Sequence, residues 1–261
     1  MSRPLAAITG ASSGIGAVFA RRLAPDYDLL LVARRKDRLQ ALAAELTGAS
    51  GTRIDIMAAD LTDGQQLAEV AQRLGLEPNL ELFVNNAGFG LRGPFWETSI
   101  AEQRRMHELN VMAVLELSHA ALGGMIRRHS GAIINVASVA GFVRRAGSVS
   151  YGSTKAWVLA FTEALHLDLQ RAGSPVQVQA LCPGFTYTEF HDVMKEDRSR
   201  LASKALWLDA RFVVDASLEG LARRRLFVIP GWRYRLVVNL ISILPGPVRL
   251  RFEALSARKR P

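Results

Sequence analysis

Short apolar segments alternate with longer amphipathic segments along almost the whole chain. The apolar segments predict strands at 5–9, 27–33, 52–60, 80–86, 131–138, 176–184 and 225–231. Between them, residues 36–46, 63–75, about 97–128 and about 150–172 have the spacing of amphipathic helices. Strands that alternate with helices favour parallel pairing through right-handed crossovers, with helices on both faces of one sheet. The pattern therefore predicts a doubly wound α/β fold with a seven-stranded parallel sheet.

The alternation contains no linker, low-complexity segment or internal repeat. A length of 261 residues is enough for one large domain with a sizeable core. We therefore predict a single domain that spans residues 1–261.

The chain is basic, with 33 lysines and arginines against 24 acidic residues, a net charge of +9 and a pI near 10.4. This balance favours anionic partners: nucleotide cofactors, phosphorylated or carboxylated substrates, acidic membrane surfaces or nucleic acid. The single cysteine, Cys182, excludes an internal disulfide, and the five histidines lack metal-ligand spacing. We expect no metal site.

The N-terminal "MSRPLAAITG" reaches glycine before any long apolar run, so it does not resemble a signal peptide. We find no segment with the roughly 18 apolar residues that a membrane-spanning helix needs. The sequence therefore predicts a cytoplasmic protein without a transmembrane segment.

A glycine-rich turn, "TGASSGIG", separates the first predicted strand from a helical segment. Gly10, Gly14 and Gly16 allow the backbone to turn tightly and to approach a pyrophosphate, while the N-terminus of the helix offers free N–H groups. Ser12 and Ser13 add hydroxyl donors. A glycine-rich turn without a ligand is the alternative, but the strand–turn–helix context favours a dinucleotide site.

The second predicted strand ends in positive charge, in "LVARRKDRL". An acidic residue at this point binds the ribose 2′-hydroxyl of NAD, whereas arginine accommodates the 2′-phosphate of NADP. Here Ala33 stands in the acidic position and is followed by Arg34, Arg35 and Lys36. We therefore predict NADP(H) as the cofactor. Arg34 is the better candidate for the phosphate, because Arg35 and Lys36 could simply begin the next helix.

From about residue 5 to 190 the sequence resembles the short-chain dehydrogenase/reductase family, single-domain branch. The resemblance rests on motifs in a fixed order: "TGASSGIG", "AADL" at 58–61, "NNAG" at 85–88, Asn110 in "ELN", Ser138 in "NVAS", "YGSTK" at 151–155 and "PG" at 183–184. The "VIPG" near the C-terminus and the basic tail are similar to beta-ketoacyl and hydroxysteroid-type reductases. The family implies a Rossmann-like three-layer αβα sandwich and a homodimer or homotetramer.

The resemblance also implies a set of cofactor-binding residues. Asp60 would border the adenine, although it could instead be a helix N-cap, and the "NNAG" asparagines could also tie neighbouring strands together. The full set is Gly10, Ser12, Ser13, Gly14, Ile15, Gly16, Arg34, Arg35, Asp60, Leu61, Asn86, Ala87, Gly88, Tyr151, Lys155, Pro183, Gly184, Thr186 and Thr188.

The candidate catalytic residues are Asn110, Ser138, Tyr151 and Lys155. Tyr151 and Lys155 are four residues apart in a helical segment and so lie on one face. A nearby ammonium lowers the pKa of a phenol and fits it for proton transfer. Ser138 would donate a hydrogen bond to the carbonyl oxygen, and by resemblance Asn110 would support a water that leads to Lys155. A lone Tyr-x-x-x-Lys pair on a helix surface is the alternative.

Segments 89–96, 139–148 and 185–207 are expected to form the substrate pocket, with 185–207 as a lid. Its apolar lining would comprise Phe89, Phe95, Val139, Phe142, Phe185 and Phe190. Arg92, Arg144 and Arg145 would either receive an anionic substrate or be solvated.

Residues 232–261 form a basic amphipathic extension that could contact a membrane surface, pack on a partner subunit or shield the pocket; we favour packing.

The predicted function is NADPH-dependent reduction of a ketone or aldehyde carbonyl, in a reversible reaction on a small, apolar molecule. Two other classes stay open: an NADP-sensing regulator without catalysis, and a nucleic-acid-binding protein. The intact Tyr151, Lys155 and Ser138 set argues against the first, and dispersed arginines without a recognition motif argue against the second.

Overall fold

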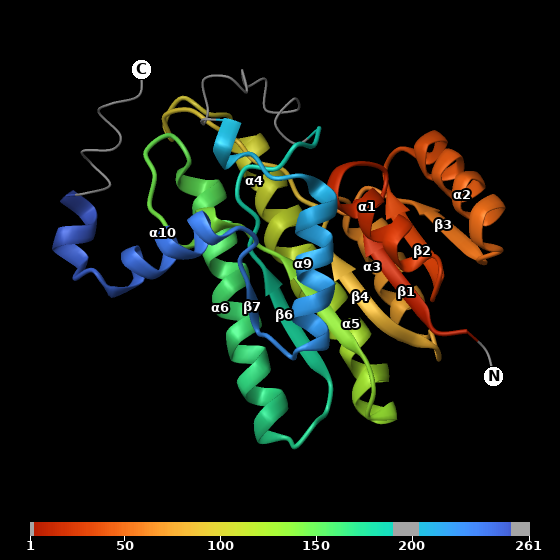
Figure 1. The fold of residues 1–261 in the computed structure, drawn as a ribbon. Helices are drawn as coiled ribbons and strands as arrows, with labels where there is room; N and C mark the ends of the chain where they lie inside the picture. The colour runs from red at the N-terminus through yellow and green to blue at the C-terminus, as the bar shows by residue number, and fades with distance from the viewer. Residues whose placement is uncertain (1–2, 190–203, 252–261) are drawn as a thin grey trace.

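The structure is a computed structural model that describes residues 3–189 and 204–251. Its seven strands all pair in parallel in the order β3-β2-β1-β4-β5-β6-β7. They are β1 Leu5–Thr9, β2 Asp28–Ala33, β3 Ile54–Ala58, β4 Leu80–Asn85, β5 Ala132–Val136, β6 Gln177–Leu181 and β7 Phe227–Val228. The predicted seven-stranded parallel sheet and doubly wound fold are confirmed, and Figure 1 shows the sheet flanked by helices.

The larger helices are α1 Gly14–Leu23, α2 Lys36–Ser50, α3 Gly64–Gly75, α4 Ile100–His107, α5 Ala113–Arg128, α6 Val149–Arg171, α9 Ala210–Ala222 and α10 Trp232–Ile243. Alternate residues of β1 serve opposite faces of the sheet. Ala6 and Ile8 pack in the core with α1, α2 and α9, whereas Leu5 and Ala7 pack with α3, α5 and α6. Burial on both faces explains why the central strands are nearly continuous apolar runs.

The helix predicted at about 97–128 is in fact interrupted. A π-helical turn at Glu108–Met112 separates α4 from α5. Such a turn adds one residue to the helical repeat and is frequent at functional sites. The amphipathic pattern predicts one continuous helix here, because it indicates helical segments without showing where the hydrogen-bonding repeat changes from one helix type to another.

The run from Ile100 to Arg128 is long and apolar enough to cross a membrane by length and composition alone, a test that the core helices of soluble proteins also pass. Half of its apolar window is buried inside the protein. Leu117, Ala121 and Met125 of α5 belong to the core between the sheet and α3. The apolar character of this run is therefore accounted for by packing in the core.

The strand order reverses direction between β1 and β4, which are neighbours in the sheet. Loops that leave the carboxyl ends of such strands diverge to opposite faces and leave a crevice between them. Here these loops are the "TGASSGIG" turn after β1 and the "NNAG" segment at the end of β4. The fold thus brings both motifs to one crevice.

Candidate active site

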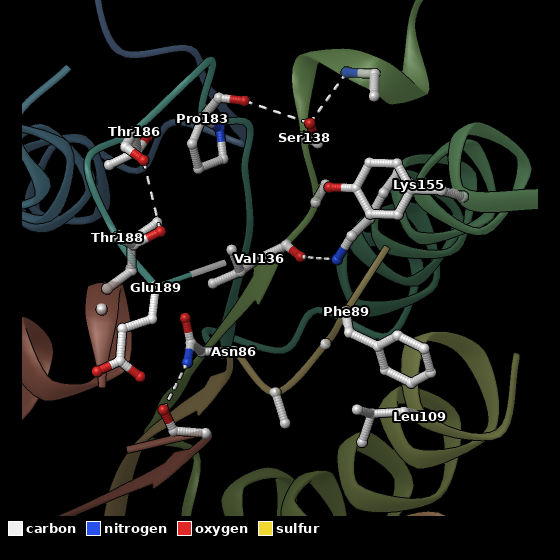
Figure 2. Close-up of a pocket in the computed structure, with 18 of the residues that line it drawn as sticks. Asn86, Phe89, Leu109, Val136, Ser138, Lys155, Pro183, Thr186, Thr188 and Glu189 are labelled. Carbon is white, nitrogen blue, oxygen red and sulfur yellow. Dashed lines mark hydrogen bonds between the residues drawn. The ribbon is translucent and has the colours of Figure 1, made fainter. Parts of the chain in front are cut away.

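A cavity of about 460 Å³ lies at this crevice and connects the glycine-rich turn with the start of α6. Figure 2 shows part of it, with Asn86, Ser138 and Lys155 around a common space. Most of the predicted cofactor residues line it: Gly10, Ser12, Ser13, Gly14, Ile15, Arg34, Arg35, Asp60, Leu61, Asn86, Ala87, Gly88, Tyr151, Lys155, Pro183, Gly184, Thr186 and Thr188. Gly16 lies just behind the lining.

The glycine-rich turn is held closely against the end of β4. Gly10 and Gly14 have φ values of 66° and 56°, a region that favours glycine. A β-carbon on Gly16 would overlap the carbonyl oxygen of Gly10. The Asn86 side chain donates hydrogen bonds to the carbonyl oxygens of Thr9 (2.9 Å) and Gly10 (3.2 Å). The turn and the "NNAG" segment therefore form one unit, and Asn86 ties the two strands together as the sequence suggested.

The arginines after β2 point to different parts of the cavity. Arg35 donates to the hydroxyl oxygens of Ser13 (2.8 Å) and Ser12 (3.2 Å). Arg34 is 65% exposed and lies 3.8 Å from the Asp60 carboxylate. From the sequence we expected Arg34 to be the better candidate for the phosphate, but Arg35 is the arginine that reaches the glycine-rich turn.

Arg35 and Lys36 do begin α2, as N-cap and first helical residue. Cations near a helix N-terminus oppose the helix dipole and do not stabilise the helix. Helix formation alone therefore gives no reason for positive charge here, whereas an anion bound at this end of the cavity would.

Asp60 does not cap the next helix; Asp63 does, accepting from the backbone N–H of Gln66 at 2.9 Å. Asp60 Oδ1 instead accepts from the N–H and hydroxyl of Thr62. Burial raises the pKa of Asp60, but these hydrogen bonds and the nearby Arg34 and Arg105 outweigh it, so that its pKa lies below the usual value. The carboxylate is thus ionised at the cavity wall.

At the other end, Ser138, Tyr151 and Lys155 line the same cavity. Ser138 precedes a short 3-10 turn at Val139–Gly141; its Oγ accepts from the N–H of Ala140 (3.1 Å) and is 3.4 Å from the carbonyl oxygen of Pro183. Tyr151 lies in the first turn of α6, with Lys155 one turn later. A β-carbon on Gly141 would overlap Leu159 and the Lys155 backbone, so close packing fixes this turn against α6.

Lys155 is 6% exposed and donates to the carbonyl oxygen of Val136 at 2.8 Å (Figure 2). Burial lowers its pKa from 10.5 to about 8. At neutral pH most of the protein therefore still carries an ammonium group on Lys155 at the cavity wall. Because the pKa is only about one unit above neutral pH, the ammonium can also give up its proton.

Asn110 lies in the π-helical turn, fully buried and behind the lining. Its side chain accepts from the N–H of Phe89 (3.2 Å) and donates to the carbonyl oxygen of Phe89 (2.9 Å) and to Thr154 (3.2 Å). A β-carbon on Gly88 would lie 3.0 Å from Asn110 Oδ1 and 3.6 Å from Lys155 Nζ. Asn110 thus joins the segment after β4 to the helix that carries Tyr151 and Lys155.

The predicted apolar pocket residues divide into two groups. Phe89, Val139 and Phe185 line the cavity. Phe95 is half exposed outside it, and Phe142 packs edge-on against Phe227 in the core. Phe190 and most of the predicted lid lie outside the described residues. Arg92 and Arg145 also line the cavity, whereas Arg144 donates to the carbonyl oxygen of Gly141 at 3.1 Å.

Several lining residues were not predicted: Leu91, Leu109, Val143, Ser148, Gly152 and Glu189. Most belong to segments that the sequence did indicate. Tyr234 of α10 was also missed. Its hydroxyl accepts from the N–H of Phe185 (3.0 Å) and donates to the carbonyl oxygen of Leu206 (2.7 Å). The start of the C-terminal extension therefore supports the loop after β6, at the edge of the cavity.

Comparison with known proteins gives a consistent result. The chain is 36% identical to sulfoacetaldehyde reductase 2 of Chromohalobacter salexigens over 206 residues, which cover 77% of this chain and 80% of that protein. A short-chain dehydrogenase from Sphingobium yanoikuyae in complex with NADPH superposes with a TM-score of 0.83, at 36% identity over 93% of this chain and 97% of that one. A short-chain dehydrogenase/reductase from Burkholderia phymatum in complex with NAD gives 0.81 at 28% identity, over 92% of both chains.

The profile of the short chain dehydrogenase family matches residues 4–199, well over half of the chain and all of the motifs from the glycine-rich turn to Pro183 and Gly184. The fold, the cavity and these relatives agree with that match. The chain belongs to the short-chain dehydrogenase/reductase family of oxidoreductases.

Proposed function

We propose that this protein is an NADP(H)-dependent carbonyl reductase that interconverts a ketone or aldehyde and the corresponding alcohol. The observation that carries the proposal is a single cavity with Ser138, Tyr151 and Lys155 at one end and the glycine-rich turn with Arg34 and Arg35 at the other. The first set suits proton transfer to an oxygen, and the second suits a phosphorylated dinucleotide.

The residues at the cavity fit a nicotinamide dinucleotide. The turn at 10–16 offers a close backbone approach and a helix N-terminus to the pyrophosphate. Asp60 and Leu61 would border the adenine, Asn86 to Gly88 the ribose, and Pro183, Gly184, Thr186 and Thr188 the nicotinamide end. A bound nicotinamide would supply the hydride or accept it.

The preference for NADP(H) over NAD(H) is part of the proposal, because relatives with either cofactor share the fold. It is supported by Ala33, which offers no acceptor to a ribose 2′-hydroxyl, and by the two arginines that follow. Positive charge at the N-terminus of α2 does not stabilise that helix. A 2′-phosphate bound there would explain why the arginines stand at this position.

In reduction, the Tyr151 phenol would donate its proton to the substrate oxygen as negative charge develops there. Ser138 Oγ would donate a hydrogen bond to the same oxygen, which stabilises that charge. The Lys155 ammonium would favour the ionised phenol electrostatically and so lower the pKa of Tyr151. Oxidation of an alcohol would use the same groups in reverse, with Tyr151 as the base.

Asn110 would act through position. It holds the backbone of Phe89 and the side chain of Thr154 together, so it fixes Phe89 at the cavity wall and the helical turn that contains both Tyr151 and Lys155. A water bound near it could carry the proton that replaces the one Tyr151 gives up.

The substrate would lie against Phe89, Val139 and Phe185, which favours an apolar body. Arg92 and Arg145 at the same cavity make an anionic carbonyl compound a reasonable member of any screen, and the relative from Chromohalobacter is named for such a compound.

The proposed assembly is a cytoplasmic homodimer or homotetramer. Light scattering after size-exclusion chromatography would test the oligomeric state.

The test is NADPH oxidation by the purified protein against aliphatic, aryl, steroid, acyl-thioester and anionic carbonyl compounds, with NADH in parallel. Turnover of at least one class, faster with NADPH and dependent on Tyr151, supports the proposal. NADPH binding without turnover of any compound would instead favour a cofactor-sensing protein.

A further inference from the structure

Glu189, on the loop after β6, forms ion pairs with arginines at the cationic end of the cavity. Its carboxylate accepts from Arg35 Nη1 at 3.0 Å and from Arg38 Nη1 at 2.6 Å. Glu189 and Arg35 both line the cavity, and Figure 2 shows Glu189 next to Thr188 at its edge. A carboxylate from a distant segment is thus shared between the guanidinium groups of the N-cap residue of α2 and of a residue in its first turn.

The position of this carboxylate is informative because Arg35 also donates to Ser12 and Ser13 of the glycine-rich turn. The Glu189 carboxylate therefore lies beside the turn that the dinucleotide would contact, at the end of β2 where the 2′-phosphate is expected. A carboxylate and a phosphate suit the same guanidinium groups. The two anions would compete for Arg35 and Arg38.

We propose that Glu189 is a cofactor-specificity residue that competes with the 2′-phosphate of NADP(H), and that Arg38 is a further member of the phosphate-binding set. The proposal rests on the proposed use of a dinucleotide at this cavity. Binding of NADPH requires Glu189 to leave Arg35 and Arg38, whereas NADH, without a 2′-phosphate, leaves the two ion pairs in place. Glu189 therefore reduces the preference for NADPH that the arginines alone would give.

The competitor is charged at neutral pH. The hydrogen bond from Arg38 lowers the pKa of Glu189, and burial opposes this, but the hydrogen bond from Arg35 and the charges of both arginines keep the pKa below its usual value. Side chains of the three residues are 41% to 43% exposed. Because exposed ion pairs are weak, a phosphate can displace Glu189 from the two arginines. Glu189 therefore lowers the affinity for NADPH without preventing its binding.

The direct test is isothermal titration of adenosine 2′,5′-bisphosphate and of 5′-AMP, which differ only by the 2′-phosphate. For Glu189→Gln and Glu189→Ala, we expect the bisphosphate to bind about three- to tenfold more tightly than to wild type, which corresponds to the loss of two exposed ion pairs. Binding of AMP should change by less than about twofold.

Glu45→Gln is the matched control. Glu45 pairs with Arg21 at 2.7 Å on the surface formed by α1 and α2 and does not line the cavity. The Glu45→Gln substitution removes the same charge from the same kind of ion pair. Equal gains in affinity for the bisphosphate in Glu45→Gln and Glu189→Gln would therefore mean a general electrostatic effect and would overturn the proposal. Unchanged or weaker binding of the bisphosphate to both Glu189 variants would also overturn it.

Arg38 is tested in the variant that lacks the competitor. Glu189→Gln/Arg38→Gln should bind the bisphosphate about three- to tenfold more weakly than Glu189→Gln alone. An equal affinity would remove Arg38 from the phosphate-binding set. These titrations need no turnover, so they test Glu189 separately from the proposed reaction. If the protein turns over no carbonyl compound but the Glu189 variants bind the bisphosphate more tightly, the proposed reaction is wrong and the role of Glu189 is supported. If the protein turns over a carbonyl compound with NADPH but the variants bind the bisphosphate no more tightly, the proposed reaction is supported and the role of Glu189 is wrong.

Discussion

At one end of the cavity the side chains are buried and held by backbone groups, whereas at the other end they are exposed and held by one another. Lys155 is 6% exposed and bonded to Val136, and Asn110 is fully buried. Arg34, by contrast, is 65% exposed. The proposed chemistry is therefore built into the packing of β5 and α6, while the cofactor preference depends on long surface side chains. Substitutions at the buried end should therefore abolish the reaction, whereas substitutions at the exposed end should change the affinity for the cofactor.

The largest effect is expected from Tyr151→Phe, at the buried end. Loss of the phenol hydroxyl removes the proposed proton donor, and we expect the rate of carbonyl reduction to fall about 100- to 10,000-fold. The dissociation constant for NADPH should stay near that of wild type, because the other lining residues are unchanged. Steady-state kinetics with a fluorescence titration measures both quantities.

Tyr187→Phe is the matched control for this variant. Tyr187 is 47% exposed and stacks on Trp207, with ring centroids 5.0 Å apart. Removal of its hydroxyl should leave the rate within about threefold of wild type. A Tyr151→Phe enzyme that keeps most of its activity would contradict the assignment of the proton donor.

The second prediction concerns the burial of Lys155 in the protein without cofactor. Its pKa is lowered on folding from 10.5 to about 8, so between these values the unfolded chain binds a proton that the folded chain does not. Wild-type stability should therefore rise with pH through this window. Relative to Lys155→Met, which lacks the titrating group, the free energy of unfolding should rise by about 3 kcal/mol between pH 7 and pH 10.5.

Urea unfolding of both proteins at several pH values measures this difference. Lys36→Met, which removes an exposed ammonium from the first turn of α2, controls for the loss of one positive charge. If the difference between wild type and Lys155→Met does not depend on pH, Lys155 keeps its ordinary pKa when the protein folds, and the buried end is more hydrated than its geometry implies.

The sequence predicted the buried end better than the exposed end, for a physical reason. Lys155 and Tyr151 lie one helical turn apart, and Ser138 follows a strand, so local spacing determines much of their arrangement. The π-helical turn at Asn110 could not be seen in the apolar pattern. The exposed end depends on a contact between Glu189 and Arg35, residues far apart in the chain, and on rotamers that local sequence does not restrict.

At the exposed end, Arg35→Ala should have the largest effect. Arg35 reaches the glycine-rich turn, and charge-assisted hydrogen bonds of this kind contribute about 1.5–3 kcal/mol. We expect the dissociation constant for NADPH to rise about tenfold to a hundredfold, while that for NADH changes little. Titration with both nucleotides separates loss of phosphate binding from loss of the site, since an equal weakening of both would show that Arg35 has only a structural role.

The smallest effect is expected from Arg34→Ala, in contrast to the preference for Arg34 that the sequence alone suggests. Arg34 lies 3.8 Å from Asp60 with most of its side chain in solvent, so its attraction for a phosphate is screened. We expect the dissociation constant for NADPH to rise about two- to fivefold, again without a matching change for NADH. Arg34→Ala/Arg35→Ala should exceed the product of the two single effects only if the arginines hold one phosphate together. A larger effect of Arg34→Ala than of Arg35→Ala would mean that Arg34 turns toward the phosphate when the nucleotide binds, and the exposed end would then be rearranged by its ligand in a way that the buried end is not.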